Sequence, residues 1–456
     1  MHKTIDATDL KIFFSRYGAH ILLADGSRVY DIGENETAEL QSWLATGVKS
    51  AAAESLLAAL CGNRAPYIEM AAPNPPPVKA FSLNLAQLCN MRCGYCYADF
   101  GQFGGTSRRM PDEIACLAVD RLLGAVSQGQ SVTLGFMGGE PLLHRALLRE
   151  VTTYAEERAR SDGKRVHFSI TTNGTLLEPE DAVFFQQHQF HVSISLDGNA
   201  QDNDRFRILN SGTGSYASAL RGLEVLRQYA WPRHVAARAT ITARSDRLWP
   251  ILDHLVSLGF DSVGLAPGLV SPDPTLAFSG SRLRVLLEQM VECGQKALNE
   301  IRQRRRYPFS NLETALRQIH CGTHRPYPCG AGAGYLSVSA EGKLFACHRL
   351  IDNEAFEMGT LQDGPDRQAR ARHLGRNHVD TIEPCRVCWA RYLCGGGCYH
   401  EVSHVGRPGC DYIRGWLEFC LQSYAEVSTD WPEYFVPSAS GTGDLTEKDL
   451  ASRSLF

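Results

Sequence analysis

Three cysteines lie close together in the segment LCNMRCGYCY at positions 88–97. Cys89, Cys93 and Cys96 could form disulfides, hold a zinc ion or hold an iron–sulfur cluster. A structural zinc site is tetrahedral and takes four ligands, commonly from pairs of the CxxC type. Three thiolates without a fourth nearby would instead leave one iron of a cubane [4Fe–4S] cluster without a protein ligand. That open iron could bind a small molecule through an amine and a carboxylate.

The composition argues against disulfides. The chain has 456 residues, 15 cysteines and a formal net charge of −4. Its first residues, MHKTIDATDLKIFF, lack the basic, apolar and small-residue sections of a signal peptide. This predicts a cytoplasmic protein, in which thiols stay reduced and serve as ligands or catalysts. The near-neutral charge gives no case for a nucleic-acid partner, and no apolar run approaches the roughly 18 residues of a membrane span, so no membrane association is expected.

Short apolar strands alternate with amphipathic helices in the middle of the chain. The strand candidates are residues 81–87, 132–138, 166–174, 190–198, 235–242 and 261–268. Helical stretches such as 111–126 and 216–230 lie between them. This alternation predicts an α/β fold with a parallel sheet, and six strands predict a partial (β/α)6 TIM-type barrel. The three-cysteine segment then follows the first strand, at the C-terminal face where barrel active sites form.

The regions on either side of this barrel differ from it in composition. Residues 1–70 combine alternating apolar residues, broken by Gly18 and Asp25-Gly26, with two helix-like stretches, which predicts a small N-terminal α+β module. The Pro-rich stretch 71–80 predicts a linker. We therefore expect a module with its linker at 1–75, the barrel at 76–305, a Cys- and Gly-rich domain at 306–430 and a loose tail at 431–456.

The CxxxCxxC spacing, followed by an aromatic residue, resembles the signature of the radical S-adenosylmethionine (SAM) enzymes. Further motifs similar to that family follow in order near the predicted strand ends: FMGGEPLL, TTNGTLL, SISLDG, NDRFR and RATIT. The resemblance implies that the three cysteines hold a [4Fe–4S] cluster and that these motifs bind SAM. The SAM-binding residues it implies are Gly138, Gly139, Glu140, Asn173, Ser195, Asp197, Arg207 and Arg238. NDRFR departs from the family's common HDxxR by Asn203 in place of histidine, and it makes Arg207 the partner for the SAM carboxylate.

The cysteines from position 321 onward resemble the SPASM extension, which holds two auxiliary [4Fe–4S] clusters in peptide-modifying radical SAM enzymes. The resemblance thus implies three [4Fe–4S] clusters in all. The ligands implied for auxiliary cluster I are Cys329, Cys347 and Cys398. Those implied for auxiliary cluster II are Cys385, Cys388, Cys394 and Cys410. Cys321 could be the fourth ligand of cluster I, or that site could be open to a substrate thiol.

The substrate class follows from the regions around this core. SPASM domains generally accompany peptide substrates, and residues 1–70 are of the kind that recognises leader peptides by strand addition. We therefore expect a small ribosomal polypeptide with a leader sequence as the substrate, with a purely structural N-terminal cap as the alternative. The resemblance also implies an external electron donor such as flavodoxin or ferredoxin.

Two reactions compete within the SPASM group. Anaerobic sulfatase maturases oxidise Cys or Ser to formylglycine and carry an Asp directly after a cluster I cysteine, where this chain has His348. The segments CGAGAGYLSVSAEGKLFACHRL and CRVCWARYLCGGGCYHEV instead resemble peptide thioether-forming maturases, and are most similar to those of quinohemoprotein amine dehydrogenase. Such enzymes join a Cys sulfur to an Asp or Glu carbon in the small subunit, using a 5′-deoxyadenosyl radical. Carbon–carbon cross-linking is a further alternative.

Thioether formation also requires a base for the substrate thiol, or a thiolate that is already present. The candidate residues are His348, Asp99 and Asp352, and the sequence does not rank them. An iron–sulfur redox sensor or scaffold is the non-enzymatic alternative, but such a protein has no use for SAM-binding motifs.

Overall fold

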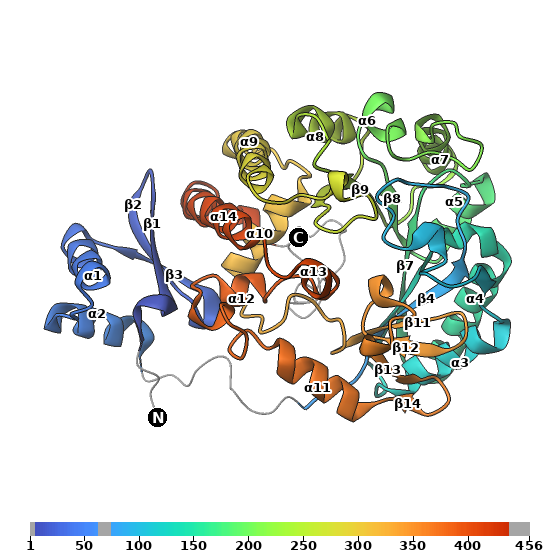
Figure 1. The fold of residues 1–456 in the computed structure, drawn as a ribbon, viewed down its shortest axis with the longest axis horizontal. Coiled ribbons are helices and arrows are strands. Elements are labelled where there is room, and N and C mark those ends of the chain that lie inside the picture. Colours follow the sequence, from blue (N-terminus) through green and yellow to red (C-terminus); the bar gives the residue numbers. More distant parts are fainter. Residues whose placement is uncertain (1–4, 63–73, 437–456) are drawn as a thin grey trace.

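The structure is a computed structural model that describes residues 5–62 and 74–436 of the chain. Its largest element is an open sheet with the strand order β10-β9-β8-β7-β6-β4-β11-β12-β13-β14, and the short β5 (Arg108–Arg109) pairs with β4. Helices lie along the outer side of the parallel half of this sheet (Figure 1). The sheet therefore has an inner face that can carry a site.

Six parallel strands form the half-barrel that the alternation predicts. They are β4 (Ala80–Gln87), β6 (Ser131–Gly138), β7 (Arg165–Thr172), β8 (His191–Ser195), β9 (His234–Ile241) and β10 (Ser262–Pro267). Each pairs in parallel with the next, and the sheet stays open because β4 pairs on its other side with β11. The predicted α/β fold with a parallel sheet is confirmed. The C-terminal ends of the six strands meet at one edge.

Helices follow these strands and bury their apolar faces against them. They are α3 (Asp112–Gly124), α4 (Arg145–Ser161), α5 (Pro179–Gln187), α6 (Ala200–Asp204), α7 (Tyr216–Tyr229), α8 (Leu248–Ser257), α9 (Arg282–Arg302) and α10 (Ser310–His320). Period-two alternation divides the strand residues between the two faces. In β9, for example, Val235, Ala237 and Ala239 are buried in the core beneath the helices. The intervening residues, Arg238 among them, point to the inner face.

The Cys-rich region continues the barrel sheet rather than forming a detached domain. It adds β11 (Tyr335–Val338), β12 (Lys343–Phe345), β13 (Glu357–Thr360) and β14 (Gly364–Pro365). β11 runs parallel to β4, and the hydroxyl oxygens of Ser82 and Ser337 lie 2.7 Å apart across this pairing. Asn84 Nδ2 donates to Ser337 Oγ at 2.9 Å. Because both regions share one buried core, the boundary expected at residues 305 and 306 does not separate two packed units.

Four more helices carry or flank the remaining cysteines: α11 (Arg367–Asn377), α12 (Arg391–Cys394), α13 (Tyr399–Val405) and α14 (Cys410–Asp430). The prediction of a loose tail from residue 431 is wrong for its first residues, because the short 3-10 helix Pro432–Phe435 is packed. Tyr434 is only 1% exposed, and its carbonyl accepts a hydrogen bond from Arg306 at 3.1 Å. A segment of this length is too short to show a hydrophobic periodicity in the sequence, so its burial could not be predicted. Residues 437–456 lie outside the described part.

The N-terminal residues form a small α+β unit with β1 (Leu10–Ser15), β2 (Gly18–Leu23), β3 (Arg28–Ile32), α1 (Glu34–Thr46) and α2 (Ala51–Cys61). Its strands form an antiparallel sheet in chain order. No single helix in the described ranges has the length and apolarity to cross a membrane. The helices α1 and α2 meet that test only as a pair, by length and composition, and they are bent by 110° at their junction. The first part of the expected linker, residues 71–73, falls among the residues that the structure does not describe.

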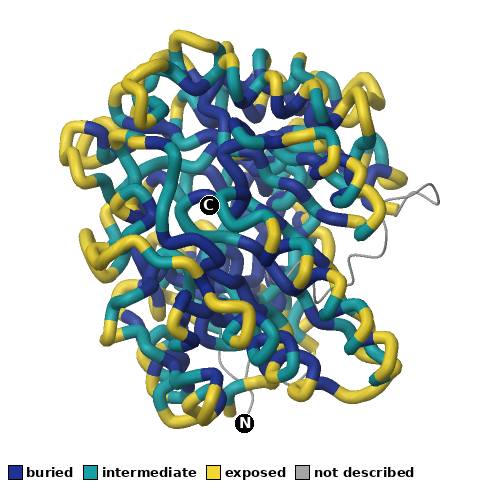
Figure 2. The backbone as a smooth tube through the Cα atoms, turned by 90° about the vertical axis from the view of Figure 1, so that its right-hand side faces the viewer, coloured by how far each residue is buried: buried dark blue, intermediate teal, exposed yellow. Residues whose placement is uncertain are grey.

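The N-terminal unit is anchored to the C-terminal helices. Phe13 and Leu22 belong to the same buried core as the barrel, and Figure 2 shows buried backbone running through the centre of the molecule. Asp9 pairs with Arg391 of α12, whose side chain is almost fully buried. Lys11 pairs with Glu418 of α14 at 3.1 Å. The unit is thus packed onto the rest of the chain and is not a loosely tethered module.

Replacing Asp9 by Ala should destabilise the protein strongly, because it leaves the buried Arg391 guanidinium without its closest acid. We expect the free energy of unfolding to fall by about 3 kcal/mol, at the low end of the usual range because Asp380 stays 3.6 Å from Arg391 Nε. Urea denaturation measures this. Glu418→Ala is the control, since its half-exposed pair with Lys11 is worth less than about 1 kcal/mol. Equal effects of the two variants would contradict the anchoring role of the buried pair.

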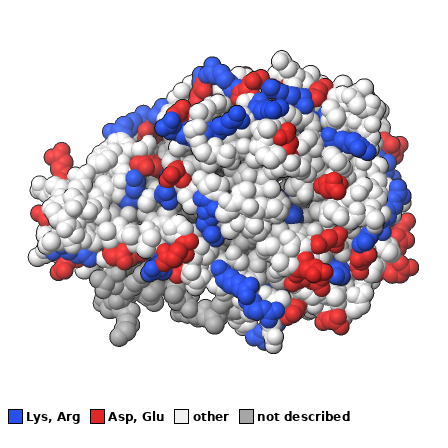
Figure 3. Space-filling model, viewed as in Figure 1, with Lys and Arg blue, Asp and Glu red and all other residues white. Residues whose placement is uncertain are grey.

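Acidic and basic side chains are interspersed over the face drawn in Figure 3. The arginines near the end of α9 fit this pattern, because each has an acidic neighbour. The pairs are Arg302–Glu426, Arg304–Glu433 and Arg305–Glu300. This arginine run therefore contributes to surface ion pairs.

Candidate functional site: three groups of thiols around one inner face

The loop after β4 brings the thiols of Cys89, Cys93 and Cys96 together. Its backbone is tied to the segment after α6, where Arg92 N–H donates to the carbonyl of Ile208 at 2.8 Å and Gly94 N–H to that of Phe206 at 2.9 Å. Burial raises the pKa of Cys89 to about 12 and that of Cys93 to about 11, and neighbouring thiols add to both shifts. Thiols held so close share a site, and they must lose their protons when a metal centre binds.

The two glycines implied for SAM binding also allow a close contact between backbone segments. A Cβ at Gly138 would lie 2.4 Å from the carbonyl oxygen of Ala86, and one at Gly139 would lie 2.2 Å from that of Leu88. Gly138 also has a φ of 134°, which favours glycine. The end of β6 is therefore pressed against the backbone that leads into Cys89. The glycines position the cysteine loop.

Glu140 links the ends of β6 and β7. Its carboxylate is fully buried and accepts hydrogen bonds from Thr172 Oγ1 at 2.8 Å and from Asn173 N–H at 2.7 Å. Asn173 in turn donates from Nδ2 to Asn90 Oδ1 at 2.8 Å, and its Nδ2 lies 3.9 Å from Cys89 Sγ. Burial raises the pKa of Glu140, while these hydrogen bonds oppose the shift. Two residues implied for SAM are thus joined to the first thiol group.

Asp197 and Arg207 meet at Tyr95, which lies between Cys93 and Cys96. The Tyr95 hydroxyl donates to Asp197, and Arg207 Nη1 donates to the Tyr95 oxygen at 2.7 Å. Asp197 also accepts from Thr240 N–H at 2.8 Å. Burial acts to lower the pKa of Arg207, but the nearby Tyr95, Cys93 and Asp197 raise it well above its usual value. The ends of β8 and β9 are therefore connected to the cysteine loop through one buried polar cluster.

A second thiol group comes from the Cys-rich region, which β11 joins to β4 of the barrel. Cys329, Cys347 and Cys398 lie near one another: burial raises the pKa of Cys347 to about 12, and the other two thiols contribute to the shift. Arg349 Nη1 lies 3.6 Å from Cys398 Sγ and donates to Glu401 at 3.2 Å. The structure therefore brings together the three residues implied for auxiliary cluster I.

Cys321 occupies a different environment. It caps the C-terminal end of α10, is exposed, and lies near enough to Tyr424 of α14 to contribute to the raised pKa of that phenol. The same phenol is influenced by Asp31 of β3. Cys321 thus faces the N-terminal unit, which favours the alternative in which cluster I has an open position.

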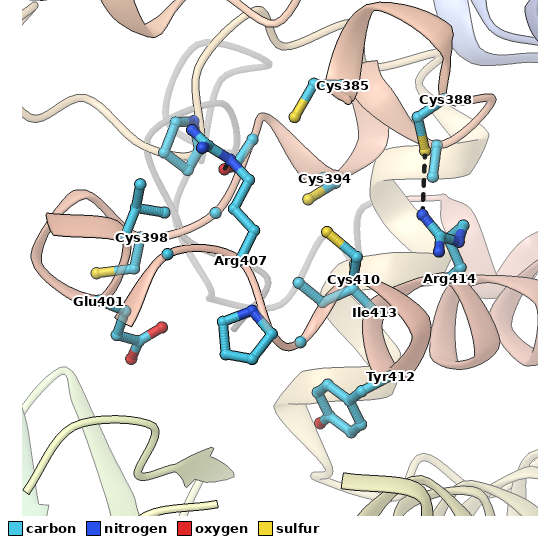
Figure 4. Close-up of a pocket in the computed structure, with 18 of the residues that line it drawn as sticks. Cys385, Cys388, Cys394, Cys398, Glu401, Arg407, Cys410, Tyr412, Ile413 and Arg414 are labelled. Atoms are coloured by element: carbon cyan, nitrogen blue, oxygen red, sulfur yellow. Dashed lines mark hydrogen bonds between the residues drawn. The ribbon is translucent and has the colours of Figure 1, made fainter. Parts of the chain in front are cut away.

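The third group, Cys385, Cys388, Cys394 and Cys410, lines one pocket. Figure 4 shows these four sulfurs turned toward one space, whereas Cys398 points away from them. Burial raises the pKa of Cys385 and of Cys410; Arg407 opposes the shift at Cys385, and Arg414 and Arg407 oppose it at Cys410. Arg414 Nη1 lies 4.0 Å from Cys388 Sγ.

These donor sets fit iron–sulfur clusters better than single metal ions. Zinc–sulfur bonds of about 2.3 Å would require the thiolates to converge on one point. In the described ranges, no three Cys, His, Asp or Glu side chains form such a single-ion site. Four thiols around one pocket, with two guanidinium groups beside them, suit a polynuclear and negatively charged cluster.

The three candidate bases lie in different surroundings. His348 Nδ1 is 3.7 Å from Cys347 Sγ and 3.1 Å from the hydroxyl of Tyr335. Burial, aided by Arg349 and Arg238, lowers the pKa of His348 to about 3, so this imidazole is a poor proton acceptor. Asp99 is exposed in a turn with a φ of 46°. Asp352 accepts from Gln87 Nε2 at 3.0 Å, beside the end of β4.

The sequence reasoning missed Tyr97 and Arg349, which connect the first and second thiol groups. The Arg349 guanidinium lies 5.1 Å above the Tyr97 ring, and that ring lies 6.2 Å from His348. Burial raises the pKa of Tyr97, and the thiols of Cys96, Cys347 and Cys398 contribute to the increase. One side chain therefore neighbours thiols of both groups. Its position directly after Cys96 is the signal that could have identified it.

Comparison with known proteins bears on the parallel strands and on the first thiol group. Residues 83–243 match the radical SAM superfamily. The serine-type anaerobic sulfatase-maturating enzyme of Klebsiella aerogenes is 26% identical over 353 residues, which cover 73% of this chain and 82% of that enzyme.

Two solved structures share the fold. Native anSMEcpe with bound AdoMet superposes with a TM-score of 0.67 at 17% identity, covering 77% of this chain and 100% of that one. Streptococcus suis SuiB bound to precursor peptide SuiA gives a TM-score of 0.51 at 13% identity, covering 88% and 97%. The CxxxCxxC loop at the end of β4 lies within the matched region, and residues 83–243 of this chain are accordingly a radical SAM domain.

Proposed function

We propose that the protein is a radical SAM enzyme that forms thioether cross-links between Cys sulfurs and Asp or Glu carbons in a small ribosomal polypeptide. The small subunit of quinohemoprotein amine dehydrogenase is the proposed substrate. The observation that carries the proposal is the position of Tyr97 beside Cys96 and also beside Cys347 and Cys398. A peptide reaching Tyr97 would lie between the site where SAM is activated and a second thiol-lined site.

In this proposal each thiol group holds one of three [4Fe–4S] clusters. Cys89, Cys93 and Cys96 hold the cluster that binds SAM. When the cluster and SAM are bound, they would supply a radical that removes hydrogen from an unactivated carbon. The cysteine loop is kept in place by the hydrogen bonds that join Tyr95, Asp197 and Arg207. Auxiliary cluster I is held by the second thiol group, and its open position would take the substrate thiol, because Cys321 lies near α14 and β3.

The N-terminal sheet is the proposed leader-binding surface. β3 lies at the edge of this sheet and pairs with β2. An edge strand offers backbone hydrogen-bonding groups to an added peptide strand. The proposed electron donor is flavodoxin or ferredoxin, and the proposed compartment is the cytoplasm, where thiols stay reduced.

Formylglycine formation is the second candidate. It is favoured by the similarity to the sulfatase-maturating enzyme of Klebsiella aerogenes. Against it stands His348, which occupies the position of the Asp that the resemblance places after the cluster I cysteine.

Mass spectrometry of the product separates the two reactions. The reduced holoenzyme is incubated with SAM and either the small subunit of quinohemoprotein amine dehydrogenase or a sulfatase peptide with the Cys to be oxidised. Thioether formation removes one hydrogen from carbon and one from sulfur, so the small subunit should lose about 2 Da and one thiol per cross-link. Loss of about 2 Da without loss of a thiol would indicate carbon–carbon linkage. A hydrazine-reactive aldehyde in the sulfatase peptide would overturn the proposal in favour of formylglycine formation.

A further inference from the structure

Two arginines face the same part of the inner surface. Arg238 projects from β9 between Ser195 of β8 and Gly264 of β10, its neighbours in the sheet. A Cβ at Gly264 would lie 3.2 Å from Arg238 Nη1, so the missing side chain leaves room for the guanidinium. The second arginine, Arg349, follows Cys347 by two residues and lies near enough to Arg238 to act on it electrostatically.

The two guanidinium groups differ in their partners. Arg349 is shared between Glu401 and Cys398, but its Nε is buried without a hydrogen-bond partner. Arg238 has no acidic hydrogen-bond or ion-pair partner in the part of the chain that the structure describes, although its side chain is accessible to solvent. Arg238 therefore has N–H groups left to bind an anion on this inner face.

We infer that Arg238 and Arg349 bind the side-chain carboxylate of the Asp or Glu that is modified in the peptide. A guanidinium presents a planar fork of N–H groups that matches a carboxylate. In Asp, the carbon to be cross-linked is directly bonded to the carboxyl group, and the same holds for the γ-carbon of Glu. Holding the carboxylate therefore holds the reacting carbon, beside Tyr97 and between the first and second thiol groups.

The inference rests on the proposed thioether reaction. It explains, through Arg238 and Arg349, why that reaction would use an acidic side chain. Sequence resemblance instead assigned Arg238 to SAM. The two roles predict different losses when Arg238 is changed, so a single set of variants separates them.

The test is binding selectivity. Reconstituted holoenzyme with SAM is exposed anaerobically to a pool of synthetic Cys-containing peptides, identical except for one position that holds Asp, Glu, Asn or Gln. Bound peptides are counted by mass spectrometry. The wild-type protein should retain the acidic peptides about tenfold over the amides, as expected for a bidentate ion pair. Arg238→Met should abolish this preference, and Arg238→Lys should restore part of it.

The matched control is Arg247→Met, which removes a surface arginine that pairs with Glu292 at 2.7 Å and should leave the preference intact. Equal retention of all four peptides by the wild-type protein, or an unaltered preference in Arg238→Met, would overturn the inference. SAM affinity is measured on the same samples, and a weakening above about tenfold in Arg238→Met would assign the residue to the cofactor instead. An Arg238-dependent acidic preference in an enzyme that makes formylglycine would uphold the carboxylate site and reject the thioether reaction.

Discussion

Replacing Cys89, Cys93 and Cys96 together by Ala is expected to abolish SAM cleavage and to remove one cluster's iron. The reconstituted parent protein should hold about 12 iron atoms per chain and the triple variant about 8, since each proposed [4Fe–4S] cluster carries four. The other two thiol groups should keep their iron, because all their cysteines lie on later segments, from Cys329 onward, and none is replaced. Iron analysis and the release of 5′-deoxyadenosine measure the two effects.

A matched control is the double variant Cys61→Ala and Cys116→Ala, which removes two thiols on helices α2 and α3. It should hold as much iron as the parent and release 5′-deoxyadenosine at a similar rate. A parent value near 4 iron atoms per chain would contradict the assignment of two auxiliary clusters.

A single added methyl group at Gly139 is expected to damage the same loop without removing a ligand. In Gly139→Ala the new Cβ would lie 2.2 Å from the carbonyl oxygen of Leu88 and 2.9 Å from the Cα of Gly101. Both obstacles are backbone, so Leu88 must move, and the hydrogen bond from Glu140 N–H to its carbonyl must lengthen or break. Since Leu88 directly precedes Cys89, we expect SAM cleavage to fall about 100-fold, as displacements of about 1 Å can cause.

The control for this variant is Gly124→Ala at the end of α3, where an added Cβ meets nothing within 4 Å. It should be neutral or slightly stabilising, because Ala favours a helix over Gly. If Gly139→Ala retains parental SAM cleavage and iron content, the proposed role of this glycine in positioning the cysteine loop is wrong.

The parallel half of the fold could be predicted because its signals are local. Each strand is a short apolar run bounded by turn residues, and the six predicted ranges agree with the observed strands within a few residues. The extension by β11 could not be predicted in this way. Tyr335–Val338 is only four residues long and pairs with β4, about 250 positions earlier in the chain, so no sequence periodicity links the two.

The resemblance to radical SAM and SPASM sequences implied three thiol groups, and the structure brings the members of each group near one another, apart from Cys321. It could not predict which polar side chains would face them. Tyr97 and Arg349 are distant in sequence, and only the packing of β11 against β4 places the Arg349 guanidinium above the Tyr97 ring. The sequence also did not reveal the backbone contact of the glycines in FMGGEPLL, where a neighbouring backbone occupies the space in which a side chain would lie.

The origin of the abstracted hydrogen tests the central claim most directly. The small subunit of quinohemoprotein amine dehydrogenase is prepared with deuterium either on the side-chain carbons of Asp and Glu or on the β-carbon of Cys, and each form is incubated with the reduced holoenzyme and SAM. We predict that 5′-deoxyadenosine gains about one mass unit per turnover with labelled Asp and Glu, and none with labelled Cys. Deuterium transfer from the Cys β-carbon alone would contradict the account and indicate oxidation of the Cys side chain, as in formylglycine formation.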